Sequence, residues 1–198
     1  METPQQEIRT LPDSSFKVET RSNGKKVIVG RAIVYNQLSQ NLGWFREQID
    51  VWALDNCDMA DVVALFNHDN NIVLGRTLSS TLTLEKKDDG LYYTIDPPKS
   101  AANLIESIER GDVRGSSFAF LVAPGGADWD TDPVSGGDVR TVKKISRLID
   151  VSPVTQPAYL QTNTDVAKRS LEEFRKAKEP VFDDTELLRM RMRLVQLK

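Results

Sequence analysis

Residues 114–122 read Arg-Gly-Ser-Ser-Phe-Ala-Phe-Leu-Val, and this stretch predicts the centre of the fold. In a β-strand, successive side chains point to opposite faces. One face of this strand would therefore carry Phe118, Phe120 and Val122. The other face would carry Ser117, beside the small Ala119. The aromatic face predicts anchoring in a hydrophobic core, which would hold the Ser117 hydroxyl on a rigid element, as a nucleophile requires.

Two further residues could activate this serine. A serine nucleophile needs a general base, and the base works best when a third group orients it. His68 is the only histidine in the chain, and it follows the apolar run 62–66, a predicted buried strand. Asp150 lies within the apolar stretch 148–151, where burial of an unpaired carboxylate would be costly. Each has an ordinary alternative: His68 as a solvated loop residue, and Asp150 as an acid that faces water at a strand end.

The composition is that of a soluble globular protein. The 198 residues are enough for one core of respectable size, with or without an appendage. The net charge of −3 argues against a nucleic-acid partner, because such proteins carry a basic surface. No apolar run approaches the ~18 residues of a membrane span. Residues 1–6 have neither the basic nor the apolar region of a secretory signal.

The single cysteine, Cys57, has no partner for an internal disulfide, which fits a reducing compartment. Its acidic neighbours Asp55 and Asp58 should raise the pKa of the thiol, so we expect a bystander rather than a nucleophile. One histidine and one cysteine cannot make a structural zinc site of the usual kind. We therefore expect no metal and no cofactor.

Alternating and turn-forming segments predict a mostly β chain. Two hairpins are expected, over 16–35 with a turn at 22–25 and over 81–95 with a turn at 87–90. Further strands are expected at 44–49, 62–66, 72–77, 114–122 and 141–151. Helices are expected after Asp50 and over 101–110, and a solvated loop over 124–138. The predicted fold class is α+β, mostly β.

The two ends of the chain differ from this middle part. Residues 1–14 are polar and predict a flexible N-terminal arm, ahead of one β domain over 15–160. Residues 161–198 predict a helical C-terminal extension with a second helix at 187–195, and residues 189–198 carry four basic groups and no acid. This extension either packs on a neighbour or serves as a docking or removable segment.

Three motifs in order resemble a known family. They are Phe-Asn-His-Asp at 66–69, Arg-Gly-Ser-Ser-Phe-Ala-Phe at 114–120, and Leu-Ile-Asp-Val-Ser-Pro-Val-Thr-Gln-Pro-Ala-Tyr at 148–159. Together they resemble the prohead (capsid maturation) proteases of tailed bacteriophages, which are similar in fold to the herpesvirus assemblins. The resemblance covers roughly residues 15–160. It implies an assemblin-like closed or partly open β-barrel flanked by helices.

The resemblance also implies roles for single residues. The family's histidine falls on His68, and its serine falls on Ser117, because the pattern is Ser-Phe-x-Phe. The acidic third member, often glutamate in the family, falls on Asp150. Ser116 is an alternative nucleophile, although alternation would direct it to the aromatic face. In assemblin-like enzymes an arginine loop contributes to the oxyanion hole, for which the candidates are Arg147 and Arg114.

The implied function is a serine endopeptidase that cleaves capsid and scaffold proteins, and itself, inside the immature prohead in the host cytoplasm. Its partners would be the major capsid protein with its scaffold segment and, by analogy with assemblins, a second copy of the chain. Neither nucleic acid nor a membrane is expected as a partner. One alternative is a non-catalytic β-barrel module that binds capsid or scaffold protein during assembly. Another is a different serine hydrolase such as an esterase, whose Gly-x-Ser-x-Gly elbow is absent from the sequence.

Overall fold

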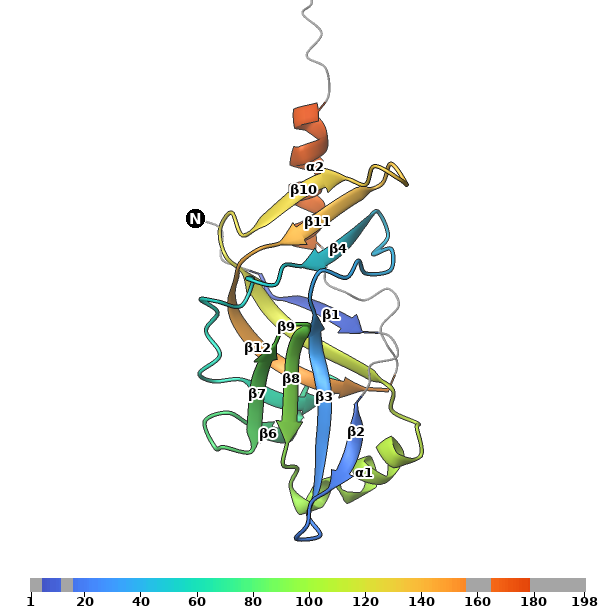
Figure 1. Ribbon diagram of the computed structural model, residues 1–198, viewed down its shortest axis with the longest axis vertical. Helices are drawn as coiled ribbons and strands as arrows, with labels where there is room; N and C mark the ends of the chain where they lie inside the picture. Colours follow the sequence, from blue (N-terminus) through green and yellow to red (C-terminus); the bar gives the residue numbers. More distant parts are fainter. Residues whose placement is uncertain (1–4, 12–15, 156–164, 179–198) are drawn as a thin grey trace, which may run out of the picture. The chain divides into compact units, whose positions relative to one another are not determined.

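The structure is a computed structural model that describes residues 5–11, 16–155 and 165–178 (Figure 1). The strands are β1 (Glu7–Leu11), β2 (Lys17–Thr20), β3 (Lys26–Val34), β4 (Phe45–Ile49), β5 (Val63–Phe66), β6 (Asp69–Arg76), β7 (Leu82–Lys87), β8 (Gly90–Ile95), β9 (Gly115–Val122), β10 (Ala127–Thr131), β11 (Asp138–Val142) and β12 (Ile145–Val154). The α-helices are α1 (Ala102–Glu109), preceded by a 3-10 turn η1 (Lys99–Ala101), and α2 (Asp165–Lys178). The chain divides into two compact units, Met1–Val166 and Ala167–Lys198.

The described strands of the first unit pair into three sheets. Their orders are β1-β9-β12-β5-β6, β2-β3-β8-β7 and β10-β11-β4. Most pairs are antiparallel, but β12 runs parallel to β5, and β11 runs parallel to β4. The predicted α+β, mostly β class is confirmed. Within the described residues each sheet keeps two edge strands, so no closed barrel forms, and the predicted assemblin-like fold stays a prediction.

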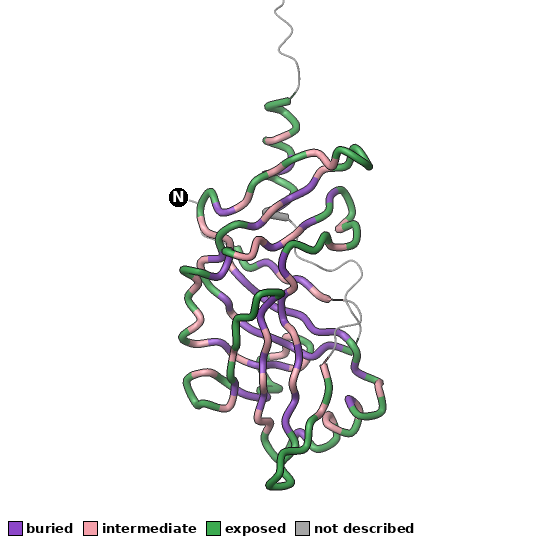
Figure 2. Tube along the Cα trace, viewed as in Figure 1, coloured by how far each residue is buried: buried purple, intermediate pink, exposed green. Residues whose placement is uncertain are grey.

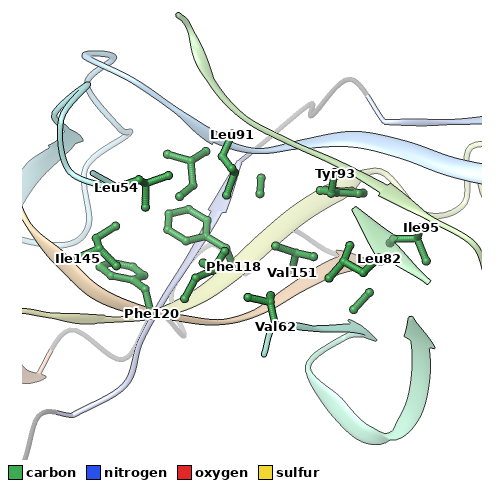
Figure 3. Packing of buried hydrophobic residues seen from close by; sticks show 14 of the residues in the cluster. Leu54, Val62, Leu82, Leu91, Tyr93, Ile95, Phe118, Phe120, Ile145 and Val151 are labelled. Carbon is green, nitrogen blue, oxygen red and sulfur yellow. The ribbon is translucent and has the colours of Figure 1, made fainter. Parts of the chain in front are cut away.

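Strand β9 lies at the centre of the core, as its aromatic alternation predicts. Phe118 is 2% exposed and Phe120 0%, and their rings stack with centroids 5.1 Å apart. Figure 2 shows β9 buried along most of its length. Figure 3 shows the side chains gathered around these two rings, which come from both large sheets and include Val62, Leu82, Leu91, Tyr93 and Val151. Burial of this cluster between two sheets fixes which face of β9 is left for Ser117.

Both predicted hairpins form, β2–β3 and β7–β8. In the second hairpin Gly90 does not supply a left-handed turn residue. It pairs with Lys87 at the start of β8, and a Cβ there would overlap the carbonyl oxygen of Ile33 in β3. Glycine is therefore needed at position 90 for the close approach of two strands.

Three sequence predictions need correction. The flexible arm over 1–14 is wrong for residues 7–11, because these form β1 and pair with β9. The loop over 124–138 contains a strand, β10, which pairs with β11. Asp50 is followed by turns rather than a helix, and its carboxylate accepts the backbone N–H of Trp52 at 2.8 Å. Strand pairing from distant segments overrode the local composition in the first two cases.

The C-terminal prediction is covered in part. Helix α2 occupies 165–178, inside the predicted extension over 161–198, whereas the second predicted helix at 187–195 lies outside the described residues. Among the described residues, neither α1 nor α2 is both long and apolar enough to cross a bilayer. The predicted domain boundaries at 14 and 160 stay predictions.

Candidate active site

Three neighbouring strands of the five-stranded sheet bring the candidate residues together. Ser117 on β9 pairs across to Ser152 on β12, and Asp150 pairs with Ala119 two positions along. Opposite residues of an antiparallel pair lie on the same face. Strand β5 lies on the other side of β12 and leads directly into the turn that carries His68. Residues far apart in the sequence therefore meet on the face of the sheet that the aromatic core does not use.

His68 sits in a tight turn between β5 and β6. Asn67 and His68 both have left-handed backbone angles, with φ of 53° and 58°. This conformation is unfavourable for most residues and persists where the surroundings hold it. Here the N–H of Asn67 donates to the carbonyl of Pro153 at 3.0 Å, and the Asn67 side chain accepts the N–H of Thr155 at 3.0 Å. The turn is thus tied to the end of β12, close to Asp150.

The three predicted side chains are in hydrogen-bond contact. His68 Nε2 lies 2.6 Å from Ser117 Oγ, and His68 Nδ1 lies 2.7 Å from Asp150 Oδ1. A carboxylate accepts and does not donate, so Nδ1 carries the proton and Nε2 is free to accept the proton of Ser117. Ser152 Oγ also donates to Asp150 Oδ1, at 2.8 Å. This arrangement can deprotonate a serine hydroxyl, which is the first requirement of acyl transfer by a serine enzyme.

Burial gives these contacts more weight than the same contacts on a surface would have. Asp150 is 3% exposed, and Ser117 and Ser152 are 0% exposed. The imidazole keeps partial exposure, with 19% of its side chain accessible. In such surroundings a hydrogen bond is electrostatically stronger than in water, and a carboxylate without partners would be destabilising. The two hydrogen bonds that Asp150 accepts meet this requirement.

Among the described residues Ser117 has two further partners, both from β1. Thr10 Oγ1 donates to Ser117 Oγ at 3.1 Å. The carbonyl oxygen of Arg9 lies 3.0 Å from Ser117 Oγ, placed to accept its proton. The hydroxyl has one proton, so His68 Nε2 and the Arg9 carbonyl are alternative acceptors. The shorter distance, to His68, favours the arrangement that leads to proton transfer.

The alternative nucleophile Ser116 points the other way. The hydroxyl of Ser116 donates to Tyr93 OH at 3.3 Å, and Ser116 is 0% exposed. Tyr93 belongs to the core cluster around Phe118. The alternation along β9 thus directs Ser116 to the aromatic face, as expected from the sequence.

The two arginine candidates make their contacts elsewhere. Arg147 pairs with Leu121, four residues from Ser117 on β9, a separation of about 13 Å along a strand. Its Nε lies 3.8 Å from a carboxylate oxygen of Asp58. Arg114 Nε donates to the carbonyl of Gly111 at 2.9 Å. The oxyanion role of both stays a prediction.

Sequence reasoning missed a buried cluster of four charges next to the site. Its members are Glu7, Arg9, Glu47 and Arg140, which are all at most 6% exposed. Arg9 Nε donates to Glu47 at 2.6 Å, and Arg140 donates to Glu7 at 2.6 and 2.9 Å. Burial alone would raise the pKa of Glu47, but Arg9 and Arg140 outweigh it and lower that pKa. Charged residues at alternate positions 7 and 9 were the only local signal for this cluster.

Cys57 is not expected to act as a second nucleophile. Burial raises the pKa of the Cys57 thiol to about 11, so the thiol stays protonated at neutral pH. Within residues 5–11, 16–155 and 165–178, no three His, Cys, Asp or Glu side chains gather in a way that could hold a metal ion.

Comparison with known proteins gives one match. A family model described as Caudovirus prohead serine protease matches residues 14–177. This range includes His68, Ser117 and Asp150, and it begins after the end of β1. No match was found among curated proteins or among solved structures.

Proposed function

Because the chain belongs to the Caudovirus prohead serine protease family, we propose that it is a serine endopeptidase that cleaves capsid and scaffold proteins, and itself, during prohead maturation. The observation that carries this proposal is the continuous contact from Asp150 through His68 to Ser117, with distances of 2.7 and 2.6 Å. These residues come from separate strands and a turn, so local sequence preferences do not account for their meeting.

In the proposed reaction Ser117 is the nucleophile. Its Oγ attacks the carbonyl carbon of the substrate peptide bond while His68 Nε2 takes its proton. The tetrahedral intermediate then collapses, His68 returns the proton to the leaving amine, and an acyl-enzyme remains. A water molecule, deprotonated by His68, attacks this ester and releases the new carboxyl end.

Asp150 acts on His68 rather than on the substrate. As the acceptor for Nδ1–H it holds the imidazole in the tautomer that leaves Nε2 free, and it offsets the positive charge that forms on the ring. The resemblance places glutamate here in many relatives, and aspartate is one methylene shorter. The 2.7 Å contact supports Asp150 in this role, because the shorter side chain still reaches the imidazole.

The buried state of Ser117 bears on when the protease acts. Ser117 is 0% exposed in this arrangement, so a local movement has to open a path to its hydroxyl before any electrophile, including a peptide carbonyl, reacts with it. This is the behaviour expected of a protease that works at one stage of particle assembly. We place its action inside the immature prohead in the host cytoplasm, with the major capsid protein and its scaffold segment as partners. An assemblin-like fold and a homodimer belong to the proposal by analogy.

The test compares single variants during co-expression with the capsid protein. Intact mass spectrometry would follow fragments of the capsid protein and of the chain itself. Ser117→Ala and His68→Ala should each remove the fragments. Ser116→Ala is the matched control, because it deletes the neighbouring hydroxyl on the core face of the same strand and should leave cleavage in place.

The alternative function, a non-catalytic module that binds capsid or scaffold protein, predicts the opposite result. Under that function Ser117→Ala would leave all processing unchanged. Loss of fragments with Ser116→Ala but not with Ser117→Ala would show that the nucleophile was assigned to the wrong serine.

A further inference from the structure

We propose that the N-terminal strand β1 belongs to the active site and that its Thr10 positions the hydroxyl of Ser117. This inference rests on the proposed function, since it assigns a role in the reaction of Ser117. The family match begins at residue 14, so β1 (Glu7–Leu11) lies outside it. The role therefore comes from the contacts of this chain alone.

The pairing of β1 with β9 places Thr10 beside the nucleophile. Thr10 and Ser117 are directly opposite one another in this antiparallel pair. Cross-strand Thr and Ser side chains at such positions share a face and can hydrogen-bond. Here Thr10 Oγ1 donates to Ser117 Oγ at 3.1 Å.

The other face of β1 explains why this placement is firm. Glu7 and Arg9 alternate with Thr10, so they point to the opposite side of the strand. There they join Glu47 and Arg140 in the buried charge cluster, through ion pairs of 2.6 to 2.9 Å. A slip of one residue would exchange the two faces, removing both charges from the cluster and Thr10 from Ser117. The cluster therefore fixes the register that brings Thr10 to the site.

The contact has a direct consequence for proton transfer. Ser117 can donate its proton either to His68 Nε2 at 2.6 Å or to the Arg9 carbonyl at 3.0 Å. Only the first orientation is productive. The hydrogen bond from the Thr10 hydroxyl fixes the position of Ser117 Oγ. The proton of Ser117 can then pass to His68 Nε2. The hydrogen bond from Thr10 also partly offsets the negative charge that develops on Ser117 Oγ, so this bond strengthens during the reaction.

The test measures the reactivity of Ser117 in the full chain with diisopropyl fluorophosphate. Ser117 Oγ attacks phosphorus, fluoride leaves, and the proton passes to His68, which gives a fixed mass increase. Thr10→Val keeps the shape of the side chain and removes the hydroxyl. We expect its labelling rate to fall about tenfold, the effect of one hydrogen bond lost from the transition state. Thr10→Ser, which keeps the hydroxyl, should label within about twofold of the parent rate.

Two controls separate a positioning role from a structural one. Thr83→Val makes the same change on β7, in another sheet, and should label at the parent rate. Thermal unfolding of every variant shows whether the protein is folded at the assay temperature. A cross-strand bond of purely structural value would lower the unfolding midpoint of Thr10→Val and leave its labelling rate unchanged.

The outcomes distinguish this inference from the proposed function. Labelling of Thr10→Val at the parent rate, or slow labelling of Thr10→Ser as well, would overturn the role of the Thr10 hydroxyl and leave the protease proposal standing. If the parent protein is neither labelled at Ser117 nor able to cleave capsid protein, both are overturned. If it cleaves capsid protein without being labelled, the cleavage rates of the same variants replace the labelling rates, with the same expected ratios. Slow labelling of Thr10→Val together with normal labelling of Thr10→Ser and Thr83→Val would support the inference.

Discussion

The buried charge cluster makes a quantitative prediction about stability. Glu47 accepts hydrogen bonds from Arg9 at 2.6 and 2.9 Å and from Arg140 at 2.8 Å. The two glutamates and two arginines of the cluster carry no net charge together. Glu47→Leu would leave one positive charge without a partner, among side chains that are at most 7% exposed. Removing one partner of a buried ion pair typically costs about 3–5 kcal/mol. For a chain of this size, that lowers the unfolding midpoint by about 6–20 °C.

The assay is a double-mutant cycle with Arg9→Met, Glu47→Leu and the combined variant, unfolded by urea at pH 7. In each single variant the free energy of unfolding should fall by about 3–5 kcal/mol, because each leaves a buried charge without its partner. The combined variant removes a matched pair and leaves Glu7 with Arg140. It should therefore lose less than either single variant, which gives a large coupling energy. Glu19→Leu in the exposed strand β2 is the control and should change stability by at most about 0.5 kcal/mol.

Two results would refute this reasoning. One is a decrease of less than about 1 kcal/mol in the free energy of unfolding for Glu47→Leu, because surface ion pairs contribute no more than this. The other is a combined variant whose loss of unfolding free energy equals the sum of the two single losses.

The pH dependence of stability gives an independent check. The arginines lower the pKa of Glu47 in the folded state below its ordinary value of 4.5. Its contribution is therefore complete above that value and is lost as the pH falls through the folded pKa.

Three further predictions follow from single residues. Asp150→Asn should lower kcat by about 10³–10⁴-fold with the fold intact, because the amide favours the wrong tautomer of His68; peptide hydrolysis at more than a tenth of the parent rate would contradict this. Burial raises the pKa of Cys57 to about 11, so at pH 8 its thiol should react with iodoacetamide at least about tenfold more slowly than an ordinary thiol, and equal rates would show that the thiol is not buried. Gly90→Ala should lower the free energy of unfolding in urea by about 1–3 kcal/mol or more, because its Cβ would overlap the carbonyl of Ile33. An unchanged urea midpoint would show that β3 and β8 can move apart at this position without a cost in stability.

Local patterns account for much of the fold and for the choice of candidate residues. The period-two alternation of β9 predicted that Phe118 would be buried and that Ser117 would face away from it, and the structure agrees on both. Turn-forming residues predicted the β2–β3 and β7–β8 hairpins. Alternation and turn chemistry operate over a few residues, so they can be read without the rest of the chain.

The N-terminal strand shows where local patterns fail. Residues 7–11 look like part of a polar arm because Glu7 and Arg9 are charged. Their burial depends on Glu47 and Arg140, which lie 38 residues from Arg9 and 133 residues from Glu7. A charged residue is stable in the interior only when its partner is also there. No property of residues 7–11 alone shows that this condition is met.

The sequence by itself determined the mostly β class, the face of β9 that carries Ser117, and a histidine and an acid to accompany it. Only the tertiary structure decided that His68, Ser117 and Asp150 touch, that Thr10 joins them, and that four charges are buried beside them. The physical reason is that alternation assigns a side chain to a face of its own strand, whereas contact depends on which strands become neighbours. That choice depends on the packing of the whole core, through pairings between residues 38 to 133 positions apart.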